Sequence, residues 1–156
     1  MRLHISVDRL DAAELRGATQ ADFLIAVDGT LRIASDDAIL FEEPSFPAVE
    51  LAWLLSAWRA APGARFQFDS MSLEEVDAVE ITPSPSGWLV ASCYRPGSAI
   101  GPFVWAEVDA GIRSFVSDIE RELRALGLDP AEVLRPPYSS RSVRAQGLRT
   151  RVEHGF

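Results

Sequence analysis

The most constraining feature of this sequence is an amphipathic pattern between Asp109 and Leu126. Apolar residues recur there at intervals of three and four, namely Ile112, Phe115, Val116, Ile119, Leu123 and Leu126. This spacing aligns side chains along one face of an α-helix, and Gly127 is typical of the residue at which such a helix ends. After it, Asp129 and Pro130 predict the cap and first position of a further short helical turn.

The N-terminal third is expected to contain strands. Leu3, Ile5 and Val7 alternate with polar residues, which predicts a half-buried strand with His4 facing water. Residues 21–35 place Asp28-Gly29 between two apolar runs, a pattern that predicts a β-hairpin turn. A short strand is expected to follow at 38–43.

A second helix is expected from about Phe46 to Ala60, with Ser45 as its cap and Pro47 in its first turn. Its main apolar stripe consists of Leu51, Leu54, Leu55 and Trp58. Val49 and Trp53 project towards the opposite side, and one sheet cannot cover both faces. Either another segment of the chain covers them, such as the tail or the second long helix, or a partner does.

Four further strands are expected at 65–69, 78–82, 87–94 and 102–108. The connection between the second and third contains Pro and Gly and is short, and sequential strands with short links usually pair as antiparallel neighbours. The predicted fold class is therefore α+β, with an antiparallel meander sheet packed against two main helices in one domain.

The charge distribution divides the chain in two. Residues 1–134 hold ten Arg and 22 acidic residues, whereas residues 135–156 hold five Arg and one acidic residue. We therefore expect an α+β domain at 1–134 and a basic, flexible tail at 135–156, either free or draped over the acidic body. Arg residues in the tail could neutralise phosphates, but the acidic body would repel a nucleic acid, so nucleic-acid binding is not expected.

Several classes of chemistry are excluded by composition. All 15 basic residues are arginine, so the chain lacks the lysine of Schiff-base enzymes and of phosphate-binding P-loops. Cys93 is the single cysteine, which rules out an intrachain disulfide and a cysteine-based zinc site. No apolar run reaches the ~20 residues of a membrane helix, and the N-terminus lacks a secretory core, so we expect a cytoplasmic protein.

A group of acids is the main candidate site. It consists of Asp69, Glu74, Glu75, Asp77 and Glu80. Their spacing matches no EF-hand loop, and paired-carboxylate catalysis would need a pocket that raises one pKa. His4 and His154 stand at opposite ends of the chain, so a hydrolase triad is not expected. We predict no catalytic residues, no metal site and no cofactor, and interpret the acids as a solvated face or a partner surface.

The order of segments resembles a group of small bacterial α+β domains, some of which act as immunity proteins in toxin systems. The resemblance covers roughly residues 21–126 and rests on "PAVELAWLLSAW", "FDSM" with the acids that follow, and "GWLVASC". It implies a single-domain inhibitor of a toxin. An acidic domain of this kind would suit a basic active-site cleft, because complementary charge speeds association.

The leading functional hypothesis is a non-enzymatic, protein-binding domain of the immunity-protein type. The five acids would steer a basic protein partner, such as a toxin, and Trp53 or Trp88 would anchor it. Two alternatives stay open: a homodimeric structural module joined through Val49 and Trp53, or a carboxylate-dependent enzyme with or without Mg²⁺.

Overall fold

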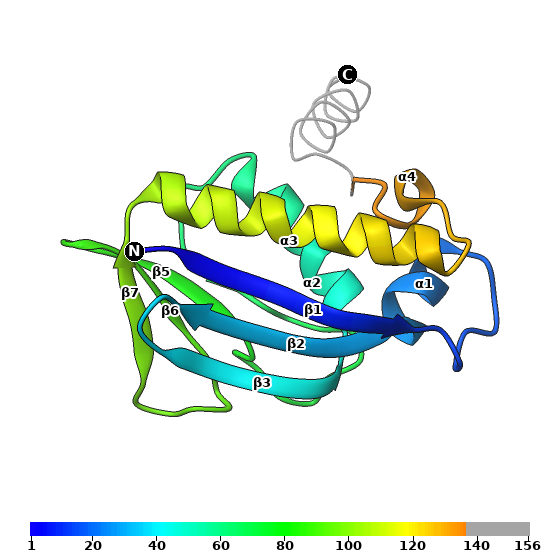
Figure 1. Ribbon diagram of the computed structural model, residues 1–156, viewed down its shortest axis with the longest axis horizontal. Coiled ribbons are helices and arrows are strands. Elements are labelled where there is room, and N and C mark those ends of the chain that lie inside the picture. The colour runs from blue at the N-terminus through cyan, green and yellow to red at the C-terminus, as the bar shows by residue number, and fades with distance from the viewer. Residues whose placement is uncertain (137–156) are drawn as a thin grey trace, which may run out of the picture.

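Two antiparallel sheets and two long helices make up the fold in the computed structural model, which describes residues 1–136 (Figure 1). The first sheet has the strand order β1 (Leu3–Asp11), β2 (Asp28–Ser35) and β3 (Ile39–Phe46). The second has the order β4 (Phe66–Gln67), β5 (Glu80–Ser84), β6 (Gly87–Ala91) and β7 (Ala99–Phe103). The helices are α1 (Gln20–Ala26), α2 (Ala48–Arg59), α3 (Trp105–Ala125) and α4 (Pro130–Val133).

The predicted α+β class and the antiparallel meander are confirmed, but the strands form two sheets rather than one. In the second sheet each strand pairs with the next one along the chain. A two-residue turn joins β5 to β6, and the Ser84 hydroxyl closes it by donating to the carbonyl oxygen of Gly87 at 2.6 Å. The predicted strand at 65–69 is shortened to two paired residues. Most of the predicted tail, residues 137–156, lies outside the described residues.

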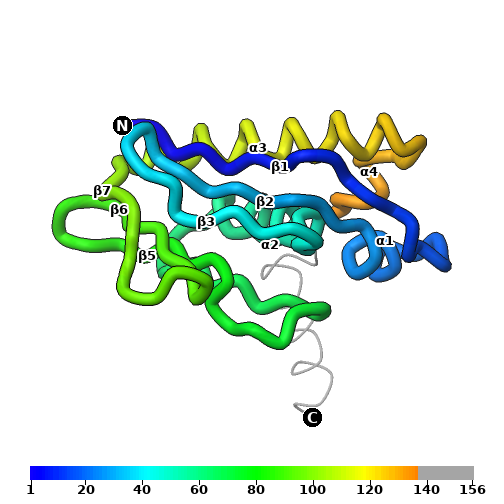
Figure 2. The backbone as a smooth tube through the Cα atoms, turned by 60° about the horizontal axis from the view of Figure 1, so that its bottom comes forward, coloured from blue at the N-terminus to red at the C-terminus, as the bar shows by residue number. Residues whose placement is uncertain are grey.

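The two long helices lie side by side on one face of the first sheet. Helix α3 runs along β1, and α2 contacts both α3 and β2 (Figures 1 and 2). Four residues of the predicted stripe, Ile112, Phe115, Ile119 and Leu123, are buried in α3, whereas Val116 is partly buried and Leu126, just past the end of the helix, is exposed. Of the described helices, none combines the length and apolar character needed to cross a membrane.

The two outlying residues of α2 are covered by the protein itself. Val49 is fully buried. Trp53 is half-buried, and its Nε1–H donates to the carbonyl oxygen of Arg135 at 2.9 Å. Val49 is therefore not exposed for the predicted homodimer contact through Val49 and Trp53, and Trp53 is only partly exposed.

The predicted hairpin turn at Asp28-Gly29 is wrong. Residues 20–26 form α1, whose cap is Thr19 in a reciprocal capping box with Asp22, and Asp28 begins β2. Gly29 is required for a different reason: a Cβ there would lie 2.4 Å from the carbonyl oxygen of Arg9. Arg9 has a φ of 49° at an irregularity in the pairing of β1 with β2, so the glycine permits a close approach of two strands.

Helix ends show both agreement and difference. Gly127 has a φ of 78° directly after α3, and Asp129 accepts from the amide of Ala131 at the start of α4, both as predicted. Helix α3 begins at Trp105 rather than near Asp109. The predicted Ser45 cap of α2 is wrong, because Ser45 belongs to β3.

A cluster of aromatic rings joins the second sheet to the helices. Trp58 at the end of α2, Trp88 on β6 and Trp105 at the start of α3 form three mutual contacts with ring centroids 5.3 to 5.6 Å apart. Phe66 of β4 packs on Trp58 at 5.6 Å. The cluster therefore fixes the second sheet against the starting turn of one helix and the final turn of the other.

Candidate functional site

The acidic link is the name used here for residues 68–79, which connect β4 to β5. Figure 2 shows it on the side of β3 away from β1. Three of its acids, Asp69, Glu74 and Glu75, are exposed, and no ion pair is found for them among residues 1–136.

The other two predicted acids have partners nearby. Arg65 donates to Glu80 at 3.0 Å and to the side-chain oxygen of Gln67 at 3.0 Å. The side-chain amide of Gln67 in turn donates to the Asp77 carboxylate. The five predicted acids thus divide into an outward set of three and a pair tied to the edge of the second sheet.

A buried carboxylate on α2 anchors the start of the link. Glu50 is 1% exposed, and it accepts from the Ser70 hydroxyl at 2.6 Å and from the Met71 amide at 3.0 Å. The Ser70 oxygen also accepts from the amides of Ser72 and Leu73, so one side chain organises a tight turn. A carboxylate held by two donors gives the link a fixed attachment to the core.

Main-chain hydrogen bonds close the link at its other end. The Phe68 amide donates to Val79 oxygen at 2.9 Å, and the Cys93 amide donates to Asp77 oxygen at 2.8 Å. Below it, the side chains of Phe41, Phe46, Phe68 and Tyr94 stack and tilt against one another. The link is therefore a loop fixed at both ends over an aromatic base.

The link imposes a negative field on the residues behind it. Burial raises the pKa of Tyr94 to about 12, with Glu75 and Glu43 adding to the rise. Burial also raises the pKa of the Cys93 thiol, and the negative charges of Glu75 and Asp77 add to this rise. The thiol is therefore less readily converted to a reactive thiolate. Glu43 of β3 thus adds to the negative charge around Tyr94 and Cys93.

Apolar side chains are exposed within the link. Met71 is 55% exposed and Val76 is 64% exposed. The two tryptophans predicted as anchors are only half-buried: Trp88 packs in the aromatic cluster, and Trp53 bonds to Arg135. Met71 and Val76, rather than the tryptophans, are the large apolar side chains that the link itself presents.

Three hollows on the described part of the chain are lined by other residues, and none of these three includes any of the five acids. Within residues 1–136 there is also no group of three or more His, Cys, Asp or Glu side chains placed to hold a metal ion. The geometry of the acidic link is that of an outward surface.

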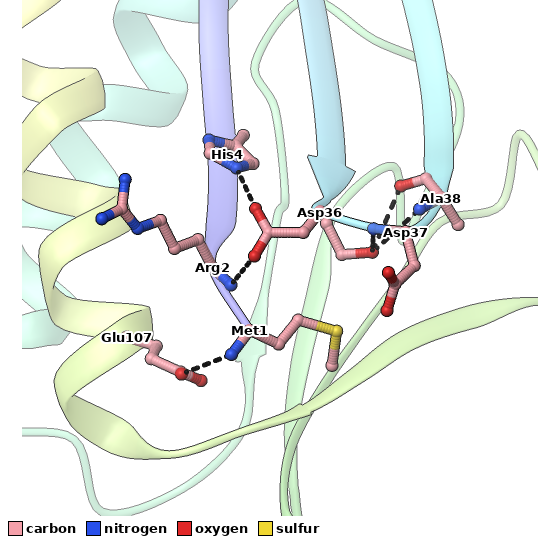
Figure 3. Close-up of polar contacts among 8 residues, drawn as sticks. Met1, Arg2, His4, Asp36, Asp37, Ala38 and Glu107 are labelled. Atoms are coloured by element: carbon pink, nitrogen blue, oxygen red, sulfur yellow. Dashed lines mark hydrogen bonds and ion pairs between the residues drawn. The ribbon is translucent and has the colours of Figure 1, made fainter.

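The largest of these three hollows, about 680 Å³, lies between the start of β1 and the first half of α3. Figure 3 shows the polar contacts beside it. His4 Nε2 lies 2.8 Å from Asp36 Oδ1, and the Arg2 amide donates to Asp36 Oδ2 at 3.0 Å. The hydrogen bond from His4, and then that from the Arg2 amide, hold the pKa of Asp36 below its usual value. His4 is about half exposed, in keeping with its predicted outward position.

Glu107 occupies the α3 side of this hollow. It accepts from the Val104 amide at 3.2 Å. It also accepts from the amino group of Met1 at 3.1 Å (Figure 3). Gly111 lies one turn further along, where a Cβ would be 2.9 Å from Leu3 oxygen. The missing side chain lets α3 approach the edge strand closely.

Most of the chain, residues 3–125, matches the sequence model of a family described as a domain of unknown function, DUF7878. This protein belongs to the DUF7878 family. No curated protein and no solved structure matches it. The matched part of the DUF7878 domain runs from β1 to the end of α3 and includes the acidic link and all residues that line the hollow beside His4 except Met1 and Arg2.

Two functional features of the DUF7878 domain were missed by sequence reasoning. Glu50 lies within an apolar helical pattern. The one signal for it in the sequence was that this acidic residue stands at a position that faces the core. Asp36 lies 32 residues from His4, and their contact follows from the pairing of β1 with β2, in which His4 is opposite Ala34. A correct register of that strand pair would have placed the two side chains together.

Proposed function

We propose that this DUF7878 domain is a non-enzymatic binding protein that recognises a basic protein through the acidic link, in the manner of an immunity protein that blocks a toxin. The observation that carries the proposal is the outward set of acids, Asp69, Glu74 and Glu75, on a loop that is fixed to the core. Carboxylates displayed in this way attract a positively charged partner and raise its association rate.

The composition of the link supports a protein partner rather than a small ion. Protein interfaces combine an apolar centre with a polar rim. Met71 and Val76 supply exposed apolar area among the acids. The acids would set the rate and orientation of the encounter, while burial of these two side chains would contribute to holding the complex together.

The fixed ends of the link also favour binding. A loop that is disordered before binding must be ordered at a cost in free energy, whereas an anchored loop has met much of that cost on folding. The bonds from Ser70 and Met71 to Glu50, and from Cys93 to Asp77, provide such anchoring. The link is therefore suited to rapid, pre-organised association.

The first test compares three forms of the full chain in affinity capture from a lysate of the source organism. The forms are the wild type, a Glu74→Arg/Glu75→Arg variant, and an Asp118→Arg/Glu122→Arg control that reverses the same charge on α3. We expect a basic protein, released by salt, to be captured by the wild type and the control but lost from the link variant. Equal capture by all three forms would remove the acidic link as the binding surface.

The second test addresses the immunity role itself. The captured protein is expressed alone and together with the domain, and growth of the host is followed. Growth arrest that is relieved by the wild-type chain and not by the Glu74→Arg/Glu75→Arg variant is the expected result. A captured protein that is harmless when expressed alone would leave the binding function standing and reject the toxin-inhibiting one.

A further inference from the structure

The outer face of β1 and β2 contains a second concave surface, separate from the acidic link. A hollow of about 360 Å³ is lined by His4 and Ser6 of β1 and by Arg32, Ala34 and Ser35 of β2. His4 also lines the hollow of about 680 Å³ beside α3, together with Arg2. The two hollows therefore adjoin at one histidine, and their sizes fall in the range of small-ligand sites.

Strand register brings two nitrogen-bearing side chains, His4 and Arg32, to this surface. Ser6 is directly opposite Arg32, and His4 is opposite Ala34, so His4 and Arg32 are diagonal neighbours within reach of long side chains. Arg2, just before β1, lines the adjoining larger hollow. We call the group Arg2, His4, Ser6 and Arg32 the His4 face.

Neighbouring acids leave much of this positive charge available. Asp36 bonds to His4 Nε2 and to the amide of Arg2, not to its guanidinium. Both oxygens of Glu107 have other donors. Arg32 is opposite Glu42 in the strand register, yet no ion pair joins them in residues 1–136, and none is found there for the Arg2 guanidinium.

We propose that the His4 face binds the phosphoryl group of a small organic phosphate. The Arg32 guanidinium provides a planar fork that matches two phosphoryl oxygens, and the Ser6 hydroxyl directly opposite provides a further donor. His4 Nδ1 makes no hydrogen bond among the described residues, and it becomes a donor when the ring is protonated. Arg2 and the larger hollow then accommodate the organic part of the ligand.

Asp36 has a positioning role in this site, because its bond to Nε2 fixes the orientation of the His4 ring. Arg2, Asp36 and Glu107 line the larger hollow and Arg32 lines the smaller one, while Glu42 is opposite Arg32 in the strand register.

The test is a titration of the ¹⁵N-labelled full chain with inorganic phosphate, with ionic strength held constant by chloride and acetate as a carboxylate comparison. We expect saturable amide shifts at residues 4–6 and 32–36, and weaker binding of acetate. Arg32→Gln should weaken phosphate binding at least tenfold. Arg121→Gln, which removes the same charge from an exposed position on α3, should leave it unchanged.

The outcomes distinguish the proposal from general attraction of anions. Shifts that never saturate, or that are the same in Arg32→Gln and in the wild type, would overturn it. Equal affinity for acetate would overturn the choice of a phosphoryl group. Arg32 is exposed, so its variant is expected to fold, and a native spectrum before titration checks this. The His4 face and the acidic link share no residue, so failure at one leaves the other standing.

Discussion

Replacing Glu50 with Gln tests whether the buried carboxylate holds the acidic link in place. The wild-type carboxylate accepts from the Ser70 hydroxyl and from the Met71 amide. A Gln side chain has one acceptor oxygen, so only one of these donors keeps an equivalent partner, and the negative charge that strengthens both bonds is lost. The change is close to isosteric, so packing around α2 should be retained.

The expected cost follows from the two hydrogen bonds. Bonds to charged groups contribute roughly 1.5–3 kcal/mol each, and neutral ones about 0.5–1.5 kcal/mol. Relief from burying a charge offsets part of the loss. We therefore expect Glu50→Gln to lower the free energy of unfolding by about 2 kcal/mol, which corresponds to a decrease in Tm of roughly 4–8 °C for a domain of this size.

Urea denaturation measures the loss, and hydrogen exchange at the Met71 amide shows where it occurs. The Met71 amide should exchange much faster in the variant, while amides in the centre of β2 change only in line with global stability. Glu120→Gln on α3 is the matched control, since this carboxylate makes only an exposed i,i+4 ion pair. Unchanged stability together with unchanged exchange at Met71 would refute the anchoring role.

Two further predictions concern other parts of the fold. Gly111→Ala would normally favour a helix by about 1 kcal/mol, but its Cβ would lie 2.9 Å from Leu3 oxygen, so we expect a net destabilisation of about 1–3 kcal/mol in urea denaturation. Ala110→Gly is the control, and a more stable Gly111→Ala variant would contradict the contact. In a Tyr138→Phe variant, absorbance should show Tyr94 ionising near pH 12 in the folded protein. Because this pKa is raised above the unfolded value of about 10, the stability that depends on protonated Tyr94 is complete below pH ~10 and is lost as the pH rises towards 12. A folded-state midpoint near pH 10 would refute this prediction.

Elements with a long, regular pattern could be predicted from the sequence, and elements decided by contacts could not. The stripe of α3 and the alternation of β1 depend on local periodicity, and both were found. Asp28-Gly29 was misread because a glycine that permits strand contact looks the same in sequence as a glycine in a turn. The Thr19 and Asp22 capping box was a local signal for α1 that the stronger hairpin pattern obscured.

The candidate site shows the same division. The outward position of Asp69, Glu74 and Glu75 could be anticipated from their place in a loop. Their anchor could not, since Glu50 precedes Ser70 by 20 residues and the bond depends on how α2 packs beside the link. Likewise, Glu43 of β3 and Glu75 of the link both raise the pKa of Tyr94, a tertiary effect that no local spacing encodes.

The cluster of Trp58, Trp88 and Trp105 gives this domain its own optical reporter. Indole rings with centroids 5.3 to 5.6 Å apart are close enough for their electronic transitions to couple, which produces paired bands of opposite sign in circular dichroism. Only Trp88 belongs to the second sheet, so two of the three couplings would be lost when that sheet separated from the helices, and the couplet would weaken to the contribution of Trp58 and Trp105. Opening at this junction could thus be followed in the unlabelled protein, independently of loss of the helices themselves.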